Sequence, residues 1–165
     1  MKTCMDTQNY DETGSDDEIQ SIKRLIRQSI TRYLAQREHG FKEIISKLTQ
    51  KGFSESLSKE VLENFRDRDW QSDIRFAEML IKRRIDRGYG SQYIIAECRS
   101  KGIGSGLVQQ ILESMEIDWY ALAAEAATRK FGDIQPKDIK EQMKRQKYLS
   151  NRGFNVDEIR AVYGG

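Results

Sequence analysis

A short motif that occurs three times decides the fold of this chain: Lys51-Gly52-Phe53, Lys101-Gly102-Ile103 and Arg152-Gly153-Phe154. A glycine just past the last turn of a helix can adopt the left-handed conformation that ends the helix, and the apolar residue after it folds back onto that turn. The glycines of the three copies are 50 and 51 positions apart. Repetition at this period is typical of tandem arrays, so the motif predicts a triplicated unit of about 50 residues.

Each motif is followed at once by a residue suited to begin a second helix. These residues are Ser54, Gly104 and Asn155, all of which are good N-caps. In the third copy Glu158 stands three residues after Asn155, an arrangement close to a capping box. Each glycine therefore predicts a tight corner between two helices.

Periodicity and capping predict an all-α fold. A shift of 50 residues places Gly40 on Gly90, and the apolar residues around them also match, so the first two units look like duplicates. The third unit is alanine-rich over 121–127 and carries the only proline, Pro136. Strand signals are poor, because no segment alternates over six residues. The expected helices are 18–37, 40–51, 54–67, 72–87, 91–101, 105–115, 118–131, 136–151 and 155–162.

The charge distribution adds an N-terminal tail to three helical repeats. Residues 1–18 hold one basic and six acidic residues, a net charge of −5, whereas the remainder carries +7. The acidic stretch lacks apolar periodicity, so we expect it to be disordered. We expect a soluble cytoplasmic protein, because no secretory signal or bilayer-length apolar run is present. The expected domains are a tail over 1–18 and three-helix repeats over 19–67, 68–117 and 118–165.

Two groups of basic residues are candidate contacts for an anionic partner, since a basic body favours polyanions. In the helix expected over 72–87, Arg83, Arg84 and Arg87 should emerge from the core as a positive cluster. The ordinary alternative is that cations simply favour the C-terminal ends of helices. In the helix expected to begin near Pro136, Ile139, Met143 and Leu149 should mark the buried side. Four lysines share an arc of about 80° on another side of it, and the alternative for them is a solvated face: Lys137, Lys140, Lys144 and Lys147.

No catalytic or metal-binding pattern is present. The single histidine, His39, precedes Gly40 at an expected helix end, where a capping or dipole role is favoured over catalysis. Cys98 occupies an apolar helix position and is expected to be a buried hydrophobe. The glycine-rich stretch 102–106 lacks the lysine and the preceding strand of a phosphate loop. We therefore expect no enzyme activity, no cofactor and no metal.

Several segments in order and spacing resemble the RecX family of bacterial regulators of the RecA recombinase. The similarity runs from about Ile22 to the C-terminus and departs over 69–73, where the family usually has a glycine and two acids and this chain has Asp69-Trp70-Gln71-Ser72-Asp73, keeping one of the acids. The segments that carry it are Arg75–Ala77, Gly88–Gly90, Lys101–Ile103, Glu116–Ala123, Ala127–Gly132 and Tyr148–Phe154, with Ile159 following.

The resemblance implies an elongated, curved, monomeric molecule that lies in the groove of the RecA filament on single-stranded DNA. Such proteins suppress strand exchange, the filament's ATP hydrolysis and its co-protease activity. The arginines and lysines named above are the contacts we expect with the filament or the DNA backbone, and direct binding to single-stranded DNA stays open. A second hypothesis is a helix-turn-helix protein that reads duplex DNA, and a third is an adaptor for an unknown partner.

Overall fold

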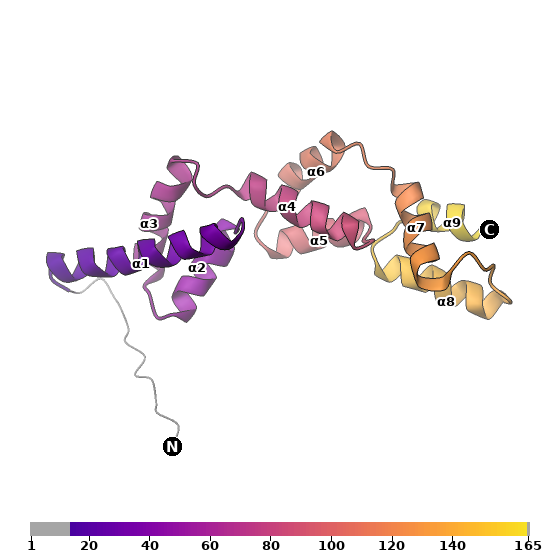
Figure 1. The fold of residues 1–165 in the computed structure, drawn as a ribbon, viewed down its shortest axis with the longest axis horizontal. Coiled ribbons are helices and arrows are strands. Elements are labelled where there is room, and N and C mark those ends of the chain that lie inside the picture. Colours follow the sequence, from indigo (N-terminus) through magenta and orange to yellow (C-terminus); the bar gives the residue numbers. More distant parts are fainter. Residues whose placement is uncertain (1–13, 165) are drawn as a thin grey trace, which may run out of the picture. The chain divides into compact units, whose positions relative to one another are not determined.

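The computed structural model describes residues 14–164, which form nine α-helices and no strand, as expected for an all-α protein (Figure 1). The helices are α1 (Asp16–Gln36), α2 (Phe41–Gln50), α3 (Glu55–Asp67), α4 (Asp73–Asp86), α5 (Ser91–Ser100), α6 (Ser105–Ser114), α7 (Trp119–Phe131), α8 (Ile139–Asn151) and α9 (Val156–Tyr163).

The first helix begins earlier than the sequence predicts. The backbone N–H of Ser15 donates to the carboxylate of Glu18 at 2.8 Å, and three acidic residues occupy the first turn of α1. Carboxylates at this end stabilise a helix through its dipole. The prediction of a disordered tail to residue 18 is therefore wrong for Asp16–Glu18, and residues 1–13 lie outside the described part of the chain.

The three corners have the predicted backbone conformation. Gly52, Gly102 and Gly153 have φ values of 90°, 84° and 86°. The residue after each glycine donates its N–H back to the preceding helix, and the three N···O distances lie between 3.0 and 3.2 Å. Its side chain is buried in every copy, at 8% exposure or less. The glycine thus ends one helix and the apolar residue fixes the direction of the next.

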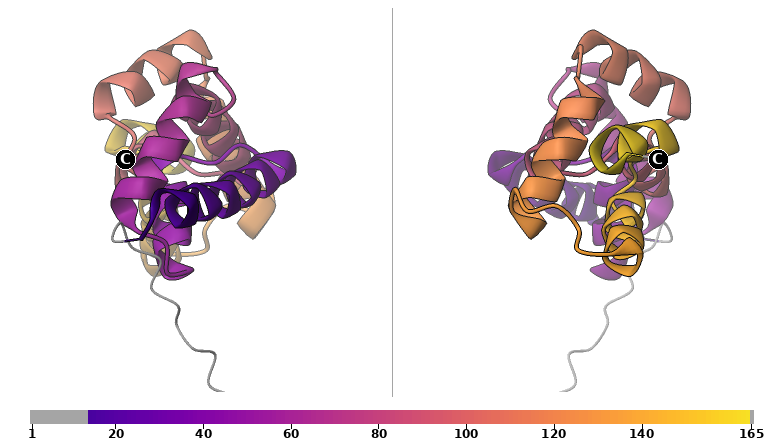
Figure 2. Two further views of the ribbon diagram at one scale, coloured as in Figure 1. Left: turned by 90° about the vertical axis from the view of Figure 1, so that its left-hand side faces the viewer. Right: turned by 90° about the vertical axis from the view of Figure 1, so that its right-hand side faces the viewer.

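The helices pack as two compact units, one ending at Phe76 and the other beginning at Ala77. In the first unit α1, α2 and α3 enclose a core built around Ile26, Ile44, Leu48 and Leu62, none of which is exposed to solvent. In the second unit, helices α7, α8 and α9 enclose a smaller core that includes Leu149 (Figure 2). The expected boundaries of the three repeats stay predictions.

In the first unit, polar residues before α4 bind the turn between α1 and α2. The carboxylate of Asp73 accepts a hydrogen bond from the backbone N–H of Phe41 at 2.8 Å. The buried amide of Gln71 donates to the carbonyl of His39 at 3.2 Å and to Asp73 at 2.9 Å. This segment is the one that departs from the RecX pattern, and the acid it retains holds the first turn of α2.

His39 and Cys98, for which the sequence predicts structural roles, are both buried. His39 is buried, with Nδ1 3.0 Å from the carbonyl oxygen of Arg37 and Nε2 2.9 Å from the ammonium of Lys47. Burial lowers its pKa, which favours the neutral imidazole. Cys98 is fully buried, and burial raises the pKa of its thiol to about 11, as expected for a core residue.

In the second unit, the corner between α8 and α9 docks on the beginning of α5. Gly90 donates its N–H to the carbonyl of Arg152 at 2.8 Å, and Gln92 donates to the carbonyl of Gly153 at 3.1 Å. A Cβ atom on Gly153 would lie 2.3 Å from the backbone nitrogen of Tyr93, and one on Gly90 would lie 2.4 Å from the Gly153 oxygen. Two glycines that face each other therefore allow a joint made of main chain.

Candidate functional site

The sequence predicts three exposed arginines near the end of α4, and the structure separates them. Arg83 and Arg87 are exposed. Arg84 is half-buried, and its Nε and Nη2 atoms each lie 2.5 Å from a carboxylate oxygen of Glu97 on α5. The expectation of exposure is confirmed for Arg83 and Arg87 and is wrong for Arg84, because a carboxylate from the next helix engages its guanidinium.

Arg84 and Glu97 each stabilise the charged form of the other. The hydrogen bonds from Arg84 lower the pKa of the Glu97 carboxyl, and the same bonds raise the pKa of Arg84. Two parallel bonds between a guanidinium and a carboxylate fix orientation as well as distance. Arg84 therefore holds α4 against α5.

We expect Arg84→Ala and Arg83→Ala to differ in stability. Removing the Arg84 side chain leaves the partly buried Glu97 carboxylate without its partner, which should lower the free energy of unfolding by about 1–3 kcal/mol. Arg83→Ala removes an exposed side chain of the same type and should change it by less than about 0.5 kcal/mol. Urea unfolding followed by circular dichroism measures both values, and equal values would contradict the structural role of Arg84.

Two arginines of the third repeat join the end of α4, and the sequence analysis missed them. Nη1 of Arg152 lies 2.5 Å from the carbonyl oxygen of Arg87, and Nη1 of Arg129 lies 3.1 Å from that of Asp86. Cations are favoured there because the last carbonyls of a helix carry partial negative charge. Arg152 belongs to the repeated motif, but the motif predicts roles only for the glycine and the apolar residue. We name Arg83, Arg87, Arg129 and Arg152 the α4-end cluster.

The predicted lysine stripe lies along α8. Lys140, Lys144 and Lys147 are exposed on this helix, and Lys137 is exposed two residues before it begins. The helix begins at Ile139, with Asp138 as its N-cap, rather than near Pro136. Within residues 14–164, no ion pair includes any of these four lysines. The stripe is thus free to meet an anionic surface.

The buried side of α8 differs from the prediction. Leu149 is buried as expected, but Ile139 and Met143 are 76% and 63% exposed, so the expectation for these two is wrong. Arg145 faces the interior instead, where its Nη2 bonds Glu141 at 2.6 Å and its Nη1 bonds the carbonyl of Ile134 at 2.5 Å. The guanidinium also lies 5.0 Å from the centre of the Phe131 ring. The bonds from Nη1 and Nη2 and the aromatic face offset much of the cost of burying this charge, although Nε is buried without a hydrogen-bond partner.

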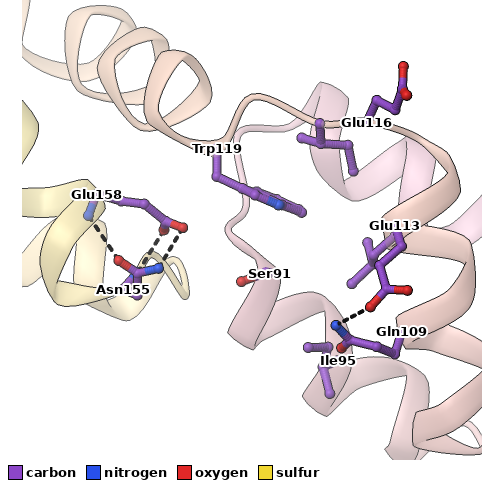
Figure 3. A pocket seen from close by; sticks show the side chains of 10 residues that line it. Ser91, Ile95, Gln109, Glu113, Glu116, Trp119, Asn155 and Glu158 are labelled. Atoms are coloured by element: carbon purple, nitrogen blue, oxygen red, sulfur yellow. Dashed lines mark hydrogen bonds between the residues drawn. The ribbon is translucent and has the colours of Figure 1, made fainter.

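A cavity of about 370 Å³ lies in the second unit beside Trp119. Figure 3 shows the indole between the Asn155 and Glu158 pair on one side and Gln109 and Glu113 on the other. The charged residues that line it are all acidic, namely Glu113, Glu116 and Glu158. Like charges repel a phosphate, so this cavity is unsuited to nucleic acid.

Two further observations concern the described part of the chain alone. Over residues 14–164, no group of three or more His, Cys, Asp or Glu side chains has a geometry that would hold a metal ion. None of the helices in this range combines the length and the apolar character needed to cross a bilayer.

Comparison with known proteins assigns the family. Residues 72–112 match the model of the second three-helix domain of RecX, and residues 116–163 match that of the third. The chain is also 34% identical over 137 residues to the regulatory protein RecX of Halorhodospira halophila, which covers 83% of this chain and 85% of the relative. The chain belongs to the RecX family.

Other RecX proteins agree with this assignment. RecX of Yersinia enterocolitica is 35% identical over 153 residues, which cover 80% of this chain and 92% of the relative. A crystal structure of a RecX protein superimposes with a TM-score of 0.76 at 19% identity, covering 94% of this chain and 80% of that chain. RecX from Lactobacillus salivarius gives 0.68 at 20% identity, covering 88% and 94%. At these identities the structures show the shared fold, and the relatives are named as regulatory proteins.

In this RecX-family chain, the helices that follow the corners offer few side chains for reading bases. They begin with Glu55 in α3, Ser105 in α6 and Val156 in α9. Glu55 is paired with Lys59 at 2.6 Å. Arginine, asparagine and glutamine are the side chains that most often read base edges in a major groove. The first residues of these helices therefore do not favour sequence-specific duplex recognition.

Proposed function

We propose that this protein regulates RecA, mainly as an inhibitor, by binding the RecA filament on single-stranded DNA. In this role it would reduce strand exchange, ATP hydrolysis by the filament and its co-protease activity. It would act as a monomer in the cytoplasm. The observation that carries the proposal is the similarity to RecX proteins along more than four-fifths of the chain.

The charged surfaces of the second unit support this proposal. The α4-end cluster places cations at the end of α4, on α7 and at the C-terminal end of α8. The lysine stripe places cations along α8 and just before that helix. Exposed cations attract both phosphates and acidic protein surfaces. A filament of protein on single-stranded DNA offers both kinds of surface, so the two basic regions suit such a partner.

The test is a titration of the purified full chain into RecA filaments assembled on single-stranded DNA. ATP hydrolysis should fall as the protein is added and should fall less at high salt, because charge–charge contacts are screened. A parallel measurement of binding to a DNA duplex alone distinguishes the helix-turn-helix hypothesis from the proposed regulation of RecA. Tight, salt-resistant duplex binding with unchanged ATP hydrolysis would overturn the proposal.

A further inference from the structure

Large apolar side chains are exposed next to the lysine stripe, and neither the core nor the stripe explains them. Met143 of α8 and Val156 of α9 are 63% and 61% exposed. Both line one groove of about 420 Å³ between these helices, together with Gln146, Lys147, Ser150, Ile159 and Arg160. We call it the α8–α9 groove. Exposed apolar surface grouped in a concave site marks a place where another molecule binds.

Contacts within the chain fix the two helices that form this groove. Helices α8 and α9 meet at the corner that Gly153 and Phe154 form, and Phe154 is buried. Asn155 and Glu158 bond each other in a capping box that fixes the first turn of α9. Val156 lies in this turn, so its position is set by the cap and does not depend on a partner.

The charges at the groove select an acidic occupant. Lys147 and Arg160 line it, and Lys140 and Lys144 lie on the adjoining arc of α8. Three acidic residues lie near the groove in sequence. Glu141 bonds the buried Arg145, and Glu158 is itself buried and bonds Asn155. Asp157 lies 3.9 Å from Arg160 and offsets part of its charge, so the lysines of α8 supply most of the positive charge. An occupant with carboxylates at the edges of an apolar strip would pair with these cations.

The apolar residues favour protein over nucleic acid at this place. A phosphate backbone would use the lysines but leave Met143 and Val156 in contact with water. Single strands bind through bases stacked on aromatic rings, and no aromatic residue lines the groove. An amphipathic helix instead places apolar side chains at i, i+3 or i+4, and i+7 into such a groove.

We propose that the α8–α9 groove docks an acidic amphipathic helix of a partner protein. Its apolar side chains would contact Met143, Val156 and Ile159, and its carboxylates would pair with Lys144, Lys147 and Arg160. The inference refines the proposed function, on which it rests for the identity of the partner, by assigning the lysine stripe to protein contact.

A binding experiment with a designed probe tests the groove independently of RecA. The probe is a helical peptide with leucines on one face flanked by glutamates, and its controls are a scrambled peptide of the same composition and oligothymidylate. Methyl NMR spectra of the full chain should show shifts of the Met143 and Val156 signals with the amphipathic peptide only. Equal shifts with the scrambled peptide would overturn the proposal, and larger shifts with oligothymidylate would assign the groove to nucleic acid.

Variants that keep every charge then isolate the apolar contribution. Met143→Ser combined with Val156→Ser should weaken binding of the amphipathic peptide at least about tenfold, since two apolar contacts are lost. Ile74→Ser is the control, because Ile74 is 52% exposed and lies on α4. Unchanged peptide affinity in the double variant would refute the groove. Inhibition of RecA by the unmodified chain is measured separately. If the unmodified chain does not inhibit RecA, the proposed function is refuted, whatever the result for the groove.

Discussion

Gly153→Ala is expected to destabilise the second unit by about 3–4 kcal/mol. A non-glycine residue at φ 86° costs about 1–2 kcal/mol. The added Cβ would also lie 2.3 Å from the backbone nitrogen of Tyr93, so the corner must move away from α5. That movement breaks the two backbone hydrogen bonds to Gly90 and Gln92, each worth about 1 kcal/mol.

Tryptophan fluorescence can report the unfolding of the second unit alone. In a Trp70→Phe background the remaining indole, Trp119, reports unfolding of the second unit in urea. Gly106→Ala is the matched control, because a Cβ there would meet no atom of another element within 4 Å and alanine is favoured in a helix. It should be neutral or slightly stabilising. A Gly153→Ala variant as stable as the Gly106→Ala variant would show that the close approach of the corner to α5 is not required.

Reversing the charge of the lysine stripe should have the largest effect on RecA inhibition. With Lys140, Lys144 and Lys147 changed to glutamate, each contact proposed for these lysines would become repulsive. At about 1 kcal/mol for each site, the concentration needed for half inhibition of ATP hydrolysis should rise by about 100-fold. Adding Lys137→Glu should increase this effect further.

A control with the same change in net charge separates the stripe from general electrostatics. Arg27, Lys42 and Lys101 are exposed and lie outside α8, so their replacement by glutamate should raise the half-inhibitory concentration far less. Circular dichroism must show the same helical content in both triple variants. Full inhibition by the stripe variant would remove the stripe from the mechanism.

Local signals predicted most of the fold. The corner glycines, their N-caps and the helical period act over a few residues, so the sequence alone located every described helix within about three residues. The largest shift is at α8, where the helix expected from Pro136 begins only at Ile139 because Asp138 is its N-cap. At α1, the hydrogen bond between Ser15 and Glu18 extends the helix into the acidic stretch.

The candidate site was harder to predict, because its arginines are placed by distant parts of the chain. Arg84 is held by Glu97, thirteen residues away, and Arg152 by a carbonyl 65 residues away. No local pattern indicates such partners. The prediction of the buried face of α8 failed at Arg145. Arginine is usually exposed, and the hydrogen bonds and aromatic neighbours that permit its burial here are not evident from the sequence.

The joint between Gly90 and Gly153 has a consequence for how such a protein can evolve. Both hydrogen bonds across it use main-chain atoms, so this joint depends on the absence of two side chains, while the side chains of Arg129 and Arg152 bond the end of α4 beside it. Mutations elsewhere in either repeat can then accumulate without separating them. The alanine-rich third repeat, whose composition differs from that of the first two, docks through this pair of glycines.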